Sequence, residues 1–407
     1  MPNTTNRSVA WVADLSGEVR IPLYSVIFVL ALLGNSLVLA TLFQNKRMRT
    51  VTNVFLMNLA VSDLLLALFC MPFTLIPVLL RNFIFGDIMC VLLRYLQGVS
   101  VSVNCFTLVA LSLERYYAIC QPLKSRRWQT LSHAYRAILL TWLLAFTVTI
   151  PIAVSNKIVF LKTGGKACRE LWHPPFIEII YTVILDMILL VTPMIIMLTT
   201  YGLIARQLWI GMKMDRKSQR DAWRVAANDE YQKMMETGNT DIVLCTRQSD
   251  TNRRMTADEL NVSPTALRST HFEKNLANKK KVIKMLIVVV LEYFTCWAPL
   301  FITNTWIAID HDDARMKMSL MAKSLIHLLS YVSSCCNPIT YCFMNRKFRQ
   351  GFLSAFRSCG FKRTFRKKRN SNGTFTAEYC STRTCTAVSF VNHPVKREDG
   401  RTSMSSI

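Results

Sequence analysis

Seven segments of this 407-residue chain are apolar over a length that suits a helix crossing a lipid bilayer. A helix rises about 1.5 Å per residue, so about 20 residues span the roughly 30 Å of hydrocarbon. Each backbone amide of such a helix finds its partner inside the helix, which leaves no unpaired polar group facing lipid. The sequence therefore predicts an all-α membrane protein, a seven-transmembrane helix bundle. The predicted spans cover residues 21–43, 53–80, 91–119, 137–155, 176–205, 282–309 and 319–344.

Positive charge is concentrated on one side of this predicted bundle. The chain has 49 Lys and Arg against 25 Asp and Glu, a net charge of +24. Most of the basic residues fall in the loops after the first and third spans, in the stretch 206–284 and in the tail after 344. Basic loops stay in the cytoplasm, so we expect a multi-pass plasma-membrane protein with its N-terminus outside and its C-terminus in the cytoplasm. The charge then requires no nucleic-acid partner.

The segment before the first span, residues 1–20, is predicted to be extracellular. It lacks a basic region ahead of a short apolar core, so we expect no cleaved signal peptide. Its two glycosylation sequons, at Asn3 and Asn6, agree with that location. Cys90, at the outer start of the third span, and Cys168, after the fourth, are placed to meet in the oxidising exterior. We expect a disulfide between them, with two free thiols as the alternative.

The cytoplasmic side is predicted to hold three further segments. The loop from about 209 to 280 is charged and poor in aromatic residues, so we expect it to be largely disordered. Apolar and basic residues alternate over 345–358, which suits a short amphipathic eighth helix on the membrane surface. Cys359 then either carries a palmitoyl chain, which would contact membrane lipid, or stays a free thiol. The tail 359–407 is rich in Ser, Thr, Lys and Arg and is predicted to be disordered.

Two polar runs lie where a lipid-embedded helix should avoid them. Leu113-Glu114-Arg115-Tyr116 closes the third span, and Asn337-Pro338-Ile339-Thr340-Tyr341 lies near the end of the seventh. Asn35 and Asp63 are also inside predicted spans. Polar groups are costly in lipid and ordinarily mark function, so we expect Asn35, Asp63 and Asn337 to face one another inside the bundle.

These runs, on the third and seventh of seven spans, resemble those of the rhodopsin-like G-protein-coupled receptors. Other landmarks of that family are matched in order by Trp142, by Pro193 and by Cys296-Trp297-Ala298-Pro299. The resemblance implies a receptor rather than an enzyme, with a heterotrimeric G protein as partner and with receptor kinases and arrestin as regulators. A membrane carrier is a remote alternative, because no repeated broken helices are visible.

The resemblance also implies a switch at the inner ends of the helices. Arg115 would pair with Glu114 while the receptor is inactive and, once released, would reach towards Tyr201 and Tyr341. An ion pair without a role is the alternative. The same resemblance assigns further switch positions to Trp297, Asn337 and Pro338.

A sodium ion near Asp63 is another implication of the resemblance, and we expect no other cofactor. Its neighbours would be Asn104 and Asn337. Asn104 stands where the family more often has Ser, and its amide would replace an ion ligand. A purely structural hydrogen-bond network is the alternative.

Two positions argue against small-molecule ligands. Gln97 stands where an amine receptor has an aspartate, and Tyr331 stands where an opsin has its retinal-binding lysine. An extracellular peptide is favoured instead, because a cationic outer rim attracts acidic ligands. The rim residues are Arg81, Arg94, Lys157, Lys162, Lys166 and Arg169.

One subgroup is the most similar. Phe69-Cys70-Met71-Pro72-Phe73 and Asn82-Phe83-Ile84-Phe85-Gly86 resemble the cholecystokinin and gastrin receptors, while Leu291-Glu292 is more similar to the arthropod sulfakinin receptors. The resemblance implies an amidated, tyrosine-sulfated neuropeptide, with coupling through Gq and calcium. A different amidated neuropeptide is the alternative.

The subgroup also implies ligand contacts. Arg169 would pair with the sulfated tyrosine, because a guanidinium offers several donors to that anion; a solvated loop charge is the alternative. Asn304 would bond the peptide backbone or its amidated end, and His327 would line the pocket unless it is a packing residue. Asp186 would meet a peptide arginine, unless it is a structural acid. Gln97 and Arg94 complete the predicted ligand site.

Overall fold

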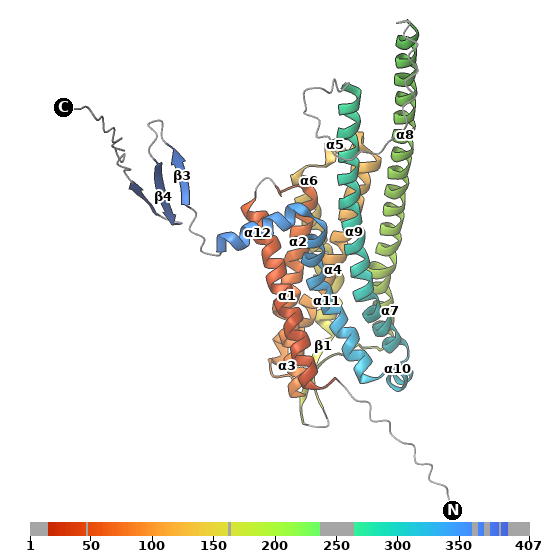
Figure 1. The fold of residues 1–407 in the computed structure, drawn as a ribbon. Coiled ribbons are helices and arrows are strands. Elements are labelled where there is room, and N and C mark those ends of the chain that lie inside the picture. Colours follow the sequence, from red (N-terminus) through yellow and green to blue (C-terminus); the bar gives the residue numbers. More distant parts are fainter. Residues whose placement is uncertain are drawn as a thin grey trace, which may run out of the picture. The chain divides into compact units, whose positions relative to one another are not determined.

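The computed structural model describes residues 15–45, 48–161, 164–236, 264–359, 365–369, 375–381 and 384–389. Within them, seven long helical segments form a bundle (Figure 1), so the predicted all-α, seven-helix architecture is confirmed. The segments are α1 (Gly17–Gln44), α2 and α3 (Val51–Leu65 and Met71–Leu80), α4 (Gly86–Cys120), α6 (Leu131–Ser155), α7 and α8 (Phe176–Asp186 and Thr192–Glu236), α9 (Pro264–Ile309) and α11 (Leu320–Met344).

Six of these segments are long and apolar enough to cross a membrane, by length and composition, among the described residues. The seventh, α11, has a sufficient length of 25 residues but is more polar, because it contains Lys323, His327 and Asn337. Two segments include a π-helical turn, Leu66–Cys70 between α2 and α3 and Met187–Val191 between α7 and α8. Such turns shift the phase of a helix and often occur at functional sites.

The short elements define the two ends of the bundle (Figure 1). One end carries α5 (Pro122–Trp128) and the start of α12 (Arg346–Cys359). The other carries α10 (His311–Lys317) and an antiparallel hairpin of β1 (Asn156–Phe160) and β2 (Lys166–Glu170). We call them the α5 end and the hairpin end. A helix thus covers most of 345–358, and its placement on a membrane surface stays a prediction.

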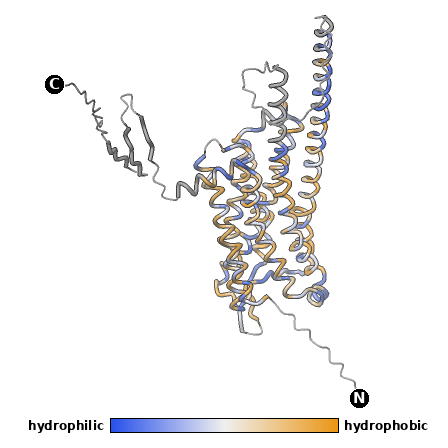
Figure 2. The backbone as a smooth tube through the Cα atoms, in the orientation of Figure 1, coloured by the Kyte–Doolittle hydropathy of each residue, from blue (hydrophilic) through white to orange (hydrophobic). Residues whose placement is uncertain are grey.

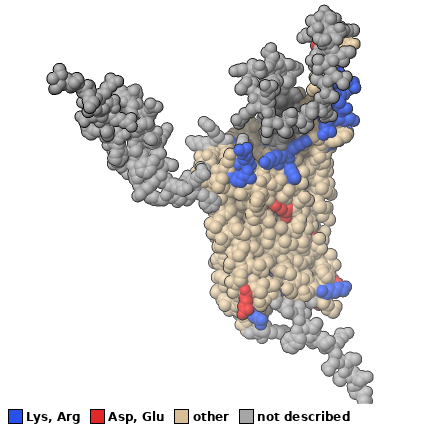
Figure 3. Space-filling model, in the orientation of Figure 1, with Lys and Arg blue, Asp and Glu red and all other residues tan. Residues whose placement is uncertain are grey.

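The outside of the bundle is apolar between its ends. Large apolar side chains point outward, among them Leu33, Leu139 and Val154, whose exposed fractions are 63%, 60% and 71%. Orange dominates the helices in Figure 2, and in Figure 3 the middle of the visible face is nearly free of Lys and Arg, which gather towards the α5 end. A surface of this kind suits contact with lipid tails.

The loop predicted to be disordered over 209–280 is helical on both sides. The structure continues α8 to Glu236 and begins α9 at Pro264. Strong helix formers explain the difference: the stretch up to 236 is rich in Ala, Met, Gln, Lys and Arg and contains no proline, so a helix that has already begun continues at little cost. Residues 237–263 lie outside the described residues.

The C-terminal tail forms a second unit, residues 353–407. It was predicted to be disordered, and the structure contains an antiparallel sheet there of β3 (Phe365–Arg369), β4 (Phe375–Ser381) and β5 (Thr384–Ser389). Aromatic and β-branched residues favour strands. In this sheet Phe365 is paired with Tyr379, and Ala377 with Val388.

Candidate functional site

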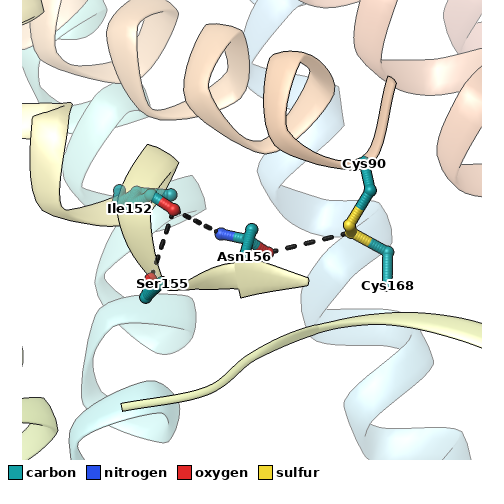
Figure 4. Close-up of a disulfide and its surroundings, with 5 residues drawn as sticks. All are labelled: Cys90, Ile152, Ser155, Asn156 and Cys168. Atoms are coloured by element: carbon teal, nitrogen blue, oxygen red, sulfur yellow. Dashed lines mark hydrogen bonds between the residues drawn. A yellow bond between two sulfur atoms is a disulfide. The ribbon is translucent and has the colours of Figure 1, made fainter. Parts of the chain in front are cut away.

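A disulfide fixes the hairpin to the bundle. Cys90, in the first turns of α4, is bonded to Cys168 of β2, with 5.5 Å between their Cα atoms. Asn156 begins β1; its amide nitrogen donates to the Ile152 carbonyl at 2.7 Å, and its amide oxygen lies 3.8 Å from the Cys168 sulfur (Figure 4). This is the pair selected from the sequence, and it holds the next residue, Arg169, beside the end of α4.

A hydrogen-bonded floor joins α4 to α11 and α3. The Gln97 amide donates to the Tyr331 hydroxyl at 3.4 Å, and that hydroxyl donates to Thr74 Oγ1 at 3.0 Å. Tyr331 is fully buried. His327 lies one turn of α11 nearer the hairpin end, and Arg94 lies one turn of α4 nearer it than Gln97. Arg94 interacts electrostatically with both His327 and Tyr331. The structure therefore brings together Arg94, Gln97 and His327, which were proposed as ligand contacts in the sequence analysis.

Asp186 has a partner that the sequence did not reveal. It ends α7, and the Thr305 hydroxyl of α9 donates to its Oδ2. Its other oxygen is buried without a hydrogen-bond partner among the described residues. The neighbouring Asn304 is exposed and makes no side-chain hydrogen bond with the described residues. Asp186 therefore has one oxygen bonded to α9 and one buried oxygen without a partner among the described residues.

Polar groups do converge at the centre of the bundle. Asp63 is fully buried and accepts from Asn104 at 2.8 Å and from Asn337 at 2.9 Å, one amide on each carboxylate oxygen. Asn35 belongs to the neighbouring layer, where its amide donates to the Ser334 carbonyl at 2.8 Å. These contacts tie α1, α2, α4 and α11 together.

The close approach of α1 to α11 beside this centre needs a glycine. A Cβ atom on Gly34 would lie 2.8 Å from Cβ of Pro338, closer than such atoms can pack. The adjacent Asn35 is thereby brought within reach of the α11 backbone.

The donors around Asp63 do not fit a sodium ion in this arrangement. A hard cation needs several oxygen ligands, but Asn104 and Asn337 turn their amide nitrogens towards the carboxylate rather than their oxygens. The oxygen of Asn104 is also engaged, because it accepts from the Ser62 hydroxyl. The amides of Asn104 and Asn337 thus supply the positive dipoles that the carboxylate needs.

At the α5 end, Glu114 and Arg115 form an ion pair. Arg115 donates to both oxygens of Glu114, and the side chains are 19% and 11% exposed. Gln129, just after α5, donates to Glu114 Oε1 at 3.1 Å. A cavity of about 950 Å³ reaches this carboxylate between α2, α4, α5 and α6. Sequence reasoning missed Gln129, because only the fold brings the loop after α5 to α4.

The other switch residues that carry aromatic rings are buried in the bundle. Tyr201 is 8% exposed and interacts electrostatically with Arg115, while Trp297 is 2% exposed. Tyr341 is fully buried, and its ring centre lies 5.6 Å from that of Phe348 in α12. The ring packing between α11 and α12 could not be read from the sequence.

A contact between α11 and α9 was also missed in the sequence analysis. The Thr340 hydroxyl of α11 donates to Glu292 of α9 at 2.5 Å, and the other Glu292 oxygen is buried without a partner among the described residues. The predicted modification sites give no such geometry: Asn3 and Asn6 lie outside the described residues, as does the side chain of Cys359.

The chain is similar in sequence to receptors of a single family. Residues 34–341 match the family described as 7 transmembrane receptor (rhodopsin family). The chain is 44% identical to the cholecystokinin receptor of Xenopus laevis over 357 residues, which cover 85% of this chain and 78% of that relative. It is 45% identical over 349 residues to the human cholecystokinin receptor type A, covering 84% and 81% of the two chains. The mouse gastrin/cholecystokinin type B receptor is 39% identical over 364 residues, with 85% and 80% covered.

Proposed function

The chain belongs to the rhodopsin family of seven-transmembrane receptors, and from that premise we propose that it is a G-protein-coupled receptor for an amidated, tyrosine-sulfated neuropeptide of the sulfakinin or cholecystokinin type. It is a multi-pass membrane receptor rather than an enzyme. The observation that carries the proposal is its identity of 39 to 46% to cholecystokinin and gastrin receptors over most of the chain. Its Glu292 favours the sulfakinin type within that range.

The hairpin end is proposed to bind the peptide. Arg169, held beside α4 by the disulfide, would pair with the sulfate, while Arg94, Gln97 and His327 would line the way to the floor at Tyr331. Asn304 would bond the peptide backbone or its terminal amide. Asp186 would pair with an arginine of the peptide. A receptor for another amidated peptide would share this floor but would not need Arg169.

The α5 end is proposed to bind the G protein. Ligand binding would favour an arrangement in which Arg115 leaves Glu114 and turns towards Tyr201 and Tyr341. A ligand shifts such an equilibrium only as far as it prefers one arrangement. Trp297, Asn337 and Pro338 lie on the two helices that would move. Coupling through Gq and calcium is part of the proposal.

The orientation of the chain in the membrane and its modifications are also part of the proposal. The N-terminus would be extracellular and glycosylated at Asn3 and Asn6, and the C-terminus would be cytoplasmic, with a palmitoyl chain on Cys359. Receptor kinases and arrestin would act on the cytoplasmic tail. The concentration of Lys and Arg towards the α5 end supports this orientation.

A response assay in transfected cells tests the proposal. Calcium and cyclic AMP are measured while the cells receive a sulfated sulfakinin-type peptide amide, its unsulfated twin, or a cholecystokinin-type peptide. We expect a calcium rise, strongest with the sulfated sulfakinin-type peptide. A receptor that reaches the surface and answers only to an unrelated amidated peptide would contradict the ligand class.

A further inference from the structure

Three cationic side chains converge at the hairpin end from three different elements. Arg169 lies on β2, Arg94 on α4 and Lys323 on α11; we call them the cation triad. Arg94 is one helical turn from the disulfide-bonded Cys90, and so lies on the same face of α4. Lys323 stands one turn beyond His327, on the face of α11 that also carries Tyr331. The triad therefore lies above the Gln97–Tyr331 floor.

Lys323 is close enough to both arginines to be affected by their charges. Lys323 interacts electrostatically with both Arg169 and Arg94. None of the three side chains makes an ion pair or a hydrogen bond with another described residue. Like charges that share a site repel, and this repulsion is relieved when an anion binds between them.

The nearest acid in the sequence does not neutralise the triad. Glu170 follows Arg169 on β2, and successive strand residues point to opposite faces. Its carboxylate accepts from Trp172 Nε1 at 3.2 Å and interacts electrostatically with Glu178 and Tyr181 of α7. Glu170 is therefore directed away from α11, and the triad lacks a counter-charge among the described residues.

We propose that the cation triad is the sulfate site of this receptor, in which Lys323 and Arg94 bind the peptide's tyrosine sulfate together with Arg169. This deepens the proposed function and rests on it. A sulfate ester presents three terminal oxygens in a tetrahedral arrangement, so donors from three directions suit it better than they suit a planar carboxylate. Two guanidiniums supply several donors each, and the lysine adds a compact charge.

The triad also explains how a sulfate could affect signalling. Its members belong to the disulfide-tethered hairpin, to α4 and to α11, and α11 carries Asn337 and Tyr341 at its other end. A sulfate bound among them would hold the outer part of α11 closer to α4. Lys323 lies two turns, or about 12 Å, from Tyr331, which leaves room for the rest of the peptide to extend towards the floor.

The test uses the full receptor in cells and one amidated sulfakinin-type peptide made with and without tyrosine sulfate. Lys323→Gln should lower the potency of the sulfated peptide about 10-fold or more, as expected for loss of a charge-assisted contact. The same substitution should change the potency of the unsulfated peptide by less than about 2-fold. Lys323→Glu should reverse the preference, because an acid at this point repels the sulfate.

Lys317→Gln is the matched control. Lys317 is also a lysine at the hairpin end, but it pairs with Asp313 at 2.7 Å, and that hydrogen bond raises the pKa of Lys317 above its usual value. We expect no change in the preference for sulfate in this variant. Surface amounts of each variant, measured with an antibody to an added tag, separate misfolding from lost binding.

The outcomes are distinct. Equal losses for both peptides in Lys323→Gln, or no loss for either, would overturn the sulfate role of Lys323 while leaving the proposed function in place. An unchanged preference in Lys323→Glu would do the same. A receptor that reaches the surface and answers to neither peptide would overturn the proposed function and this site together.

Discussion

Asn104 donates from its amide to Asp63 across 2.8 Å, so α4 supplies a neutral donor where a cation would otherwise balance the buried carboxylate. Asn337 does the same from α11 at 2.9 Å. With two amide donors, the central acid is satisfied by the protein alone. The bond from Asn104 also leaves its own oxygen for Ser62, which links α2 and α4 a second time.

This arrangement predicts that peptide affinity is insensitive to sodium. Asn104→Ser would free one Asp63 oxygen and add a hydroxyl ligand, so we expect the variant to become sodium-sensitive, with affinity falling about 5-fold. Binding is measured in sodium chloride and in potassium chloride at the same ionic strength, which removes simple screening. A wild-type receptor that already distinguishes the two salts would contradict the account.

The pair at the α5 end predicts two opposite phenotypes. Glu114→Gln should raise signalling without ligand, because Arg115 loses the charge that holds it; we expect the active-state equilibrium to shift about 5-fold or more. Arg115→Ala should abolish signalling while peptide binding persists. Gln129→Ala, which removes only a hydrogen bond to Glu114, should raise basal activity less. Unchanged basal activity in Glu114→Gln together with intact signalling in Arg115→Ala would rule out the switch.

The Asp186 carboxylate predicts a specific charge dependence. Asp186→Asn should lower the affinity for a peptide that has arginine before its terminal phenylalanine amide by roughly 30-fold or more. The same peptide with citrulline should lose far less, because citrulline is neutral. Thr305→Val is the control, since it removes the hydroxyl that bonds Asp186 but keeps the carboxylate. Equal losses for the arginine and citrulline peptides in Asp186→Asn would make Asp186 a structural acid.

The contact between Thr340 and Glu292 predicts an effect on stability. Thr340→Val leaves a buried carboxyl group without its donor, which should cost about 1 to 3 kcal/mol and lower the thermal midpoint of the purified receptor by a few degrees. Thr199→Val is the matched control, because Thr199 is exposed and, among the described residues, its hydroxyl bonds only the Ile195 carbonyl of its own helix. Equal midpoints for the two variants would show that the contact between α9 and α11 contributes nothing.

Most of the fold could be predicted because six of the seven membrane helices follow from apolar length, and Cys90 and Cys168 could be paired because they alone among the cysteines lie on the predicted outer side of the spans. Contacts set by helix phase could not be predicted. The π-helical turn after Asp186 changes which residues of α7 and α8 face α9, so Thr305 was missed. Lys323 looked like any lysine near a helix end, where such side chains ordinarily reach water; only the fold places it near Arg94 and Arg169.

The most direct test compares wild type with Arg169→Ala in the calcium response to a sulfated peptide amide and to its unsulfated twin. Loss of a desolvated charge contact costs about 2 to 5 kcal/mol, or roughly 30- to several-thousand-fold. We therefore predict that the variant loses potency by that factor for the sulfated peptide and keeps the response to the unsulfated one. Equal potency losses for the two peptides, or a wild-type receptor that does not prefer the sulfated peptide, would contradict the account.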